Sequence, residues 1–72
     1  MPAALRAIIR AFERCGGVVE QPSGGSHWKA KRDGKTYPLP AGNGTKTELS
    51  DQYIRGLCRC FGLDEVEFRK LL

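Results

Sequence analysis

The sequence predicts a single α+β domain in the order α-β-β-β-α, with a three-stranded antiparallel sheet, helices on one face of it and a short C-terminal helix. Three observations carry this prediction. Apolar residues recur with helical spacing at both ends of the chain, strand-like alternation fills the middle, and an Asp33-Gly34 dipeptide separates two strand-like runs. Because 72 residues can bury only one thin core, we expect residues 1–72 to form one domain.

The first element is predicted to be a helix that begins near Pro2 and ends before Gly16-Gly17. Its apolar side chains have the i, i+3, i+4, i+7 spacing of one buried helix face. That face consists of Leu5, Ile8, Ile9 and Phe12, extended by Ala4, Ala11 and Cys15. The other face carries Arg6, Arg10 and Arg14, which is either a solvated surface or a docking surface for an acidic partner.

A short β-branched strand, residues 18–21, and a loop, residues 22–25, follow this helix. The next two strands flank Asp33-Gly34, a dipeptide that favours a two-residue type I′ turn. A turn of this length fixes the register between its strands. It pairs Arg32 with Lys35 and, at the far end of the hairpin, His27 with Pro40.

The register divides the hairpin side chains between two faces, because strand residues alternate in direction. The face expected to pack on the helices is apolar and consists of Trp28, Ala30, Tyr37 and Leu39. The open face carries His27, Lys29, Lys31 and Thr36. Pro38 and Pro40 fall where a missing N–H would point away from the partner strand, so the third strand is expected at a sheet edge. The histidine strand is then central.

Two helices are predicted after the loop of residues 41–44. Thr45 and Glu48 fit a capping box for the second helix, and a later start at Ser50-Asp51 is the alternative. Its apolar stripe consists of Leu49, Tyr53, Ile54, Leu57 and Phe61. Gly62 ends this helix, and Asp64 is the expected cap of the short third one, whose apolar face continues to Leu71 and Leu72.

The net charge of +4 is concentrated in one segment. Residues 27–47 carry all of the excess positive charge. Their basic residues are Lys29, Lys31, Arg32, Lys35 and Lys46, and their single acidic residue is Asp33. The charges of the remaining residues sum to zero. A localised basic patch is typical of a nucleic-acid binder. The alternative is a lysine-rich sheet face whose charge keeps the protein from aggregating.

Composition also limits the location and the cofactors. No apolar run approaches the ~20 residues of a membrane span and no secretory signal is visible, so we expect a cytoplasmic protein without membrane contact. Cys15, Cys58 and Cys60 are odd in number, and nothing in their spacing with His27 indicates a zinc site. We expect reduced thiols and no metal or other cofactor.

The ordered set of motifs resembles the HicA family of toxin-antitoxin systems. The matching pieces are Gly25-Ser26-His27, the hairpin through Asp33-Gly34, Leu39-Pro40, Phe61-Gly62-Leu63 and Phe68, in an order that covers nearly the whole chain. The resemblance implies a fold like the double-stranded RNA-binding domain and an mRNA interferase activity that depends on His27. It also implies a HicB-type antitoxin that covers the active face.

One stretch departs from the family pattern. Many members carry a second histidine or a basic residue just after the proline of the third strand, whereas this chain has Pro40-Ala41-Gly42-Asn43. A nuclease with different activity and a protein that retains RNA or antitoxin binding without catalysis are both compatible with this departure.

The chemistry that fits is metal-independent RNA cleavage, because the 2′-OH can attack the adjacent phosphorus once a base removes its proton. His27 would be the general base or acid. Lys29 and Lys31 would hold flanking phosphates, and Ser26 or the Gly25 backbone would donate to a phosphate oxygen. Lys46 would add a contact near the start of the second helix.

Two other function classes remain open at the level of sequence. One is a non-catalytic RNA-binding module, in which Trp28 and Tyr37 could act as stacking platforms for bases. The other is an interaction protein whose basic face receives an acidic partner. The core position that the register gives both aromatic residues favours packing over stacking.

Overall fold

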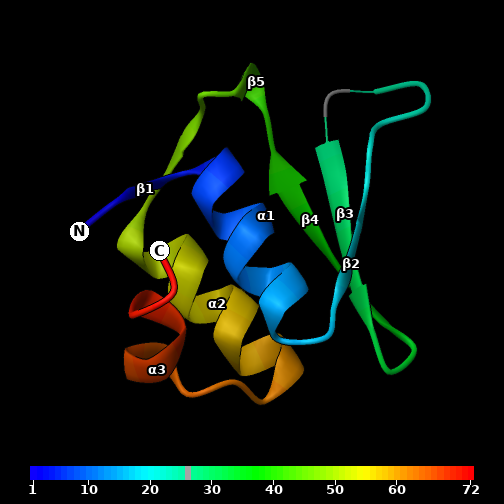
Figure 1. Cartoon of the computed structure of the whole chain (residues 1–72). Coiled ribbons are helices and arrows are strands. Elements are labelled where there is room, and N and C mark those ends of the chain that lie inside the picture. The colour runs from blue at the N-terminus through cyan, green and yellow to red at the C-terminus, as the bar shows by residue number, and fades with distance from the viewer. Residues whose placement is uncertain (26) are drawn as a thin grey trace.

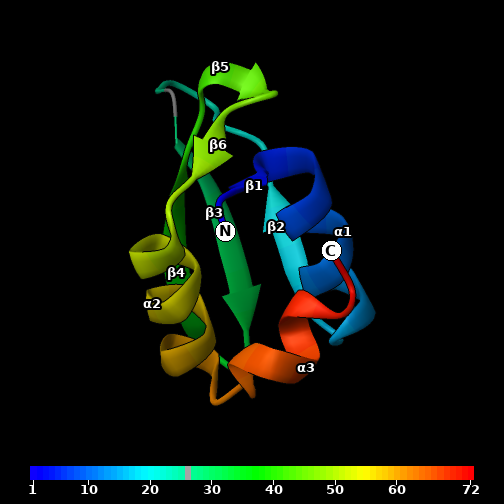
Figure 2. The same ribbon diagram turned by 90° about the vertical axis from the view of Figure 1, so that its left-hand side faces the viewer.

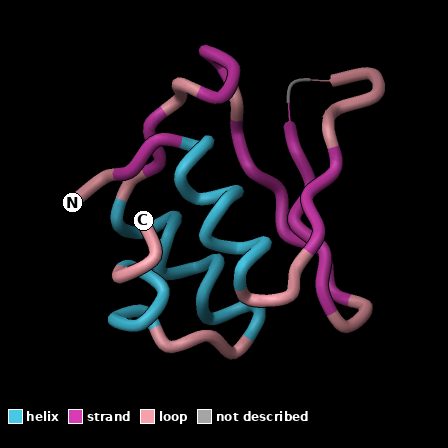
Figure 3. The backbone as a smooth tube through the Cα atoms, in the orientation of Figure 1, coloured by secondary structure: helices cyan, strands magenta, loops and turns pink. Residues whose placement is uncertain are grey.

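The computed structural model describes residues 1–25 and 27–72 and has the predicted α+β architecture (Figure 1). Its elements are β1 (Ala3–Ala4), α1 (Leu5–Arg14), β2 (Val18–Glu20), β3 (His27–Arg32), β4 (Lys35–Pro40), β5 (Gly42–Thr45), β6 (Glu48–Leu49), α2 (Asp51–Phe61) and α3 (Glu65–Arg69). The antiparallel sheet has the order β2-β3-β4, so the strand that begins with His27 is central. The three helices lie together on one side of this sheet (Figure 3).

The β3–β4 hairpin has the predicted turn and register. Asp33 and Gly34 have φ values of 52° and 78°, the pair of positive angles that a type I′ turn requires. Arg32 pairs with Lys35 and His27 with Pro40. The division of the hairpin into a core face and an open face is therefore confirmed.

The start of α1 differs from the prediction. The helix begins at Leu5 rather than near Pro2, because Ala3 and Ala4 are extended and pair with Leu49 and Glu48 of β6 (Figure 2). The Leu5 N–H then donates to the Thr47 carbonyl at 2.7 Å. The first N–H groups of a helix have no partner within the helix. Here the strand β6 and the carbonyl of Thr47 supply partners for the backbone before and at Leu5.

Helix α2 begins at Asp51, with Ser50 as its N-cap, which is the later of the two predicted starts. The Ser50 hydroxyl accepts a hydrogen bond from the Tyr53 N–H at 3.3 Å, so the capping box of Thr45 and Glu48 is wrong. Thr45 instead ends β5, where a loop was expected, and Glu48 begins β6. The predicted Asp64 cap of α3 is confirmed, since its carboxylate accepts from the Glu67 N–H at 3.0 Å.

The core lies between the helices and the sheet. Its buried members are Leu5, Ile8, Ala11, Phe12, Ala30, Leu39, Leu49, Ile54, Leu57, Cys58, Phe61 and Phe68. The rings of Phe12 and Phe61 join α1 to α2, with centroids 4.8 Å apart. Trp28 and Tyr37 pack against this cluster and are only partly exposed, as expected of the core face. Leu72 is 38 % exposed, so the predicted apolar continuation of α3 does not bury it.

Helix α2 covers the outer edge of β4. The Tyr53 hydroxyl donates to the carbonyl of Pro38, and its ring lies edge-on to Tyr37 with centroids 5.3 Å apart. Burial raises the pKa of both phenols. Gly56 makes room for this contact, because a Cβ there would overlap the Tyr37 hydroxyl. The edge strand that the two prolines predicted is thus closed by a tyrosine from a helix.

Arg69 of α3 links α3 to the start of α2 and to the N-terminus. Arg69 bonds Glu65 at 2.9 Å through Nε, Asp51 at 3.1 Å through Nη2, and the Met1 carbonyl at 2.8 Å through Nη1. Hydrogen bonds from Arg69 and Arg55 lower the pKa of Glu65. Hydrogen bonding to the N-terminal amine and to Arg69 lowers the pKa of Asp51.

Replacing the small residue at the α2–β4 contact should destabilise the fold. Gly56→Ala favours the helix by ~1 kcal/mol, but overlap with the Tyr37 hydroxyl costs about 1–3 kcal/mol, so we expect lower stability in urea unfolding. Removing that hydroxyl relieves the overlap. Tyr37→Phe combined with Gly56→Ala should therefore recover the parental stability, and additive losses in this double-mutant cycle would contradict the steric explanation.

Acid should weaken the Arg69 network. Asp51 and Glu65 have lowered pKa values in the folded state, so the folded protein binds fewer protons than the unfolded chain. Their stabilisation is present above their ordinary pKa values of about 4 and is lost as the pH falls through the lowered ones. The melting temperature should drop over this range, and Arg69→Gln should make the drop shallower. An unchanged pH profile in that variant would exclude the network as its cause.

Candidate nucleic-acid interface

His27 lies at the head of the central strand, on the open face. It is the first residue of β3, pairs with Pro40, and its side chain is exposed, as the register predicts. A surface hollow of about 360 Å³ borders it, lined by the end of β2, the loop of residues 21–25, His27 and Lys29. A polymer strand lying on this face can reach the imidazole without any rearrangement of the core.

The two lysines that follow on the same face differ in their partners. Lys29 is exposed and has no ion pair within the described part of the chain. Lys31 is partly buried and pairs with the Glu20 carboxylate at 3.0 Å. Glu20 is also the direct cross-strand partner of Lys29. The structure therefore brings His27 and Lys29 together as predicted, while Lys31 is already neutralised by β2.

The glycines before the histidine form one wall of the hollow. A Cβ added to Gly24 or Gly25 would meet nothing within 4 Å, so close packing does not explain why these positions lack side chains. Their backbone is open to a ligand on this side. Ser26, the other predicted donor, lies outside the described residues.

Lys46 is not where the sequence placed it. It lies in the turn between β5 and β6 and is exposed, whereas α2 begins only at Asp51. The early helix start was wrong, so Lys46 receives no support from the positive end of that helix. Strand β5 lies at the end of the molecule where β3 begins, which Figures 1 and 2 show from two sides.

A second hollow lies at the opposite end of the hairpin and was not predicted. It measures about 460 Å³ and is lined by Lys31, Arg32 and Lys35 together with Asp33 and residues of β2. Arg32 approaches Asp33 at 3.5 Å, while its buried Nη1 atom has no hydrogen-bond partner among the described residues. Arg32 and Lys35 flank the type I′ turn. Their positions on either side of Asp33-Gly34 are the sequence signal from which this second hollow could have been predicted.

The arrangement is suited to phosphates rather than to metal ions. Side chains on one face of a strand repeat every ~6.6 Å, so His27, Lys29 and Lys31 form a line along β3 that a polyanion can follow. Within residues 1–25 and 27–72, no three His, Cys, Asp or Glu side chains gather as metal ligands would. The three cysteines are free thiols, and burial raises the pKa of Cys58 to about 11, which keeps it protonated.

Comparisons of the chain with protein-family models, with curated proteins and with solved structures gave no match. In the described part of the chain, no helix is both long and apolar enough to cross a bilayer.

The ion pair on the open face gives a test of this interface. Glu20→Gln removes a negative charge from the hollow and releases Lys31, so affinity for a single-stranded RNA oligonucleotide should rise several-fold. Lys29→Gln should lower it by a similar factor and reduce the slope of log affinity against log salt by ~0.7.

The matched control for the first variant is Glu48→Gln, which makes the same change in net charge at an exposed residue of β6. It should raise the affinity only slightly. Equal gains in the two glutamine variants, measured by fluorescence anisotropy, would mean that net charge alone is responsible and that the hollow is not the contact.

Proposed function

We propose that this protein is the toxin of a type II toxin-antitoxin system, an mRNA interferase that cleaves RNA without a metal ion and uses His27 as its acid-base group. The observation that carries the proposal is the exposed imidazole at the head of β3, beside the exposed cation of Lys29. The ordered motifs that resemble the HicA family support it independently.

The reaction begins at a ribose 2′-OH placed in the hollow. The neutral imidazole of His27 takes the hydroxyl proton while the 2′-oxygen forms a bond to the adjacent phosphorus. The bond from phosphorus to the 5′-oxygen breaks, and that oxygen takes a proton from water or from Lys29. The imidazolium of His27 then gives its proton to the hydroxide or the lysine amine left by this step. The products are a 2′,3′-cyclic phosphate and a free 5′-hydroxyl, and the enzyme returns to its starting protonation state.

The cation and the open backbone would stabilise the charge that builds on the phosphoryl oxygens. Lys29 projects from the same face as His27, one strand period along β3. Gly25 borders the hollow, so its backbone N–H is a candidate donor to a phosphate oxygen. Ser26 is the other donor that the sequence predicts. Lys31 contributes only when its pair with Glu20 opens. Lys46, at the β5–β6 turn, would contact RNA beyond the hollow.

The family resemblance extends the proposal to a partner and a compartment. A HicB-type antitoxin would cover the open face and block access to His27. An antitoxin acidic at its contact surface would fit Lys29 and, at the second hollow, Lys35, which unlike Lys31 and Arg32 has no ion pair among the described residues. Because the proposed substrate is mRNA, the proposed location is the cytoplasm.

A non-catalytic RNA-binding module is the second candidate. The residues after β4 favour it, since Ala41, Gly42 and Asn43, which follow the cross-strand partner of His27, carry no second acid or base. That module would use the same cations and leave RNA intact.

Cleavage of single-stranded RNA in EDTA separates the two candidates. The parent protein should cut the RNA, and His27→Ala should cut it ~10²–10⁴-fold more slowly because it loses the general base. Gln52→Ala, an exposed substitution on α2, is the matched control and should cleave at the parental rate.

Circular dichroism should give parental spectra for both variants, because the side chains of His27 and Gln52 are exposed. RNA that is retained by the parent protein in a gel but never cut would exclude the nuclease and favour the binding module.

A further inference from the structure

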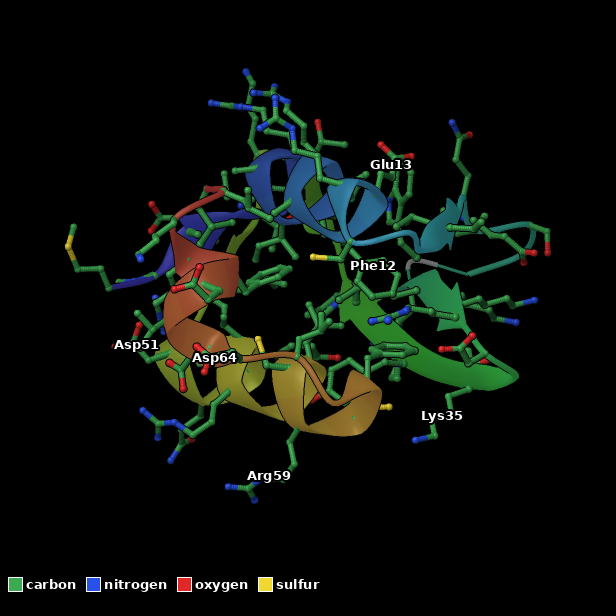
Figure 4. The ribbon with its side chains drawn as sticks, turned by 60° about the horizontal axis from the view of Figure 1, so that its bottom comes forward. Phe12, Glu13, Lys35, Asp51, Arg59 and Asp64 are labelled. Carbon is green, nitrogen blue, oxygen red and sulfur yellow. The ribbon has the colours of Figure 1, made fainter. Side chains whose placement is uncertain are left out.

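The outer face of α1 carries a row of three arginines that the proposed site does not use. Arg6, Arg10 and Arg14, which we call the arginine row, follow one another at intervals of four residues, and all three are exposed. At about 100° per residue they lie opposite the buried face of the helix formed by Leu5, Ile8 and Phe12. Figure 4 shows nitrogen-tipped side chains gathered outside α1, on the side away from Phe12.

Within the described residues, no carboxylate forms an ion pair with the row. Of the other arginines, Arg32, Arg55 and Arg69 each lie within 4.0 Å of an acidic side chain. Helix α1 itself offers a single acidic residue, the exposed Glu13. Asp51 and Glu65 pair with Arg69, and Glu67 pairs with Lys70, so the row remains an uncompensated positive surface.

The fold accounts for only one of these charges, because Arg14 stands in the last turn of α1, where the helix dipole favours a cation. Like charges four residues apart repel each other along a helix. Arg6 also stands in the first turn, where the helix dipole disfavours a cation, and that turn has neither an acidic residue nor a side-chain cap. Arg6 and Arg10 therefore stabilise nothing in the helix that carries them, which indicates a role in binding.

The chemistry of the row favours phosphates over an acidic protein surface. Successive arginines are ~6 Å apart along the helix axis, which suits contacts to successive phosphates of one strand. Guanidinium groups bind phosphate oxygens in a bidentate manner. A protein interface would need an apolar or aromatic anchor among the charges, and the exposed large apolar residues of the described chain, such as Val18 and Val66, lie in other elements.

We propose that the arginine row binds the sugar-phosphate backbone of RNA at a place separate from His27 and anchors the strand that the open face receives. The choice of RNA rests on the proposed function. The row faces away from the core on the helical side, whereas the hairpin register places His27 on the opposite, open face of the sheet. One strand that contacts both surfaces must pass around the molecule, so the anchor should matter for long RNA and little for a short one.

The test measures RNA binding in a His27→Ala background, so that cleavage does not interfere. Arg10→Gln should lower the affinity for a 5′-fluorescein-labelled 30-nucleotide RNA several-fold. The triple variant of the row should lose at least tenfold and reduce the slope of log affinity against log salt by about 2. Arg59→Gln is the control, because Arg59 is exposed on α2 and points away from α1 in Figure 4.

Three results would overturn the proposal. They are parental affinity in the triple variant, equal losses in Arg10→Gln and Arg59→Gln, and loss of binding to poly-L-glutamate with RNA binding intact, which would identify an acidic protein as the occupant. Thermal melting detects misfolding. Relief of repulsion offsets the loss of the favourable last-turn charge of Arg14, so the row variants should melt close to the parental temperature. Because cleavage is not measured, failure of the nuclease proposal and failure of the anchor are distinguishable.

Discussion

The two-residue turn at Asp33-Gly34 is the constraint on which the rest of the structure depends. A type I′ turn aligns β3 and β4 in one register, and a slip by a single residue would exchange the faces of the sheet. His27 would then point into the helical layer and Trp28 into solvent. Burying an imidazole without a partner and exposing an indole are both unfavourable, so the core enforces the register that the turn begins. The site is in this sense a consequence of how the core packs.

The same register decides how the sheet ends. With His27 central, β4 is an edge whose prolines cannot donate to a further strand. Its remaining acceptor at Pro38 is taken by the Tyr53 hydroxyl, and Gly56 allows the helix to come close enough for that bond. The open face is therefore left free for a ligand, while the β4 edge of the sheet is closed against strand addition.

The sequence predicted the features that are determined locally and missed those determined by distant segments. The hairpin register follows from two adjacent residues, and the Asp64 cap from one turn of helix. The start of α1 depends on pairing between Ala3 and Leu49, which no periodicity near Pro2 reveals. The pair of Lys31 with Glu20 likewise requires the β2–β3 alignment, so the sequence overestimated the free charge on the open face. The charge outside residues 27–47 sums to zero only because the sum combines the arginines of α1 with acidic residues of α2 and α3. Those acidic residues are paired with cations in or next to the same two helices.

These differences change how the proposed reaction would obtain its binding energy. Among the described residues, Lys29 is the cation near His27 that no carboxylate holds, and Glu20 on the same face repels phosphate. A reacting phosphodiester bound by one lysine is held weakly in water at physiological salt. Binding energy from remote parts of a polymer can compensate, since contacts away from the reacting atoms can position the strand. In the proposed reaction the arginine row and the site at His27 would depend on each other: the open face would keep a hollow accessible enough for the 2′-OH, and the helix would supply the charge that such a hollow cannot hold.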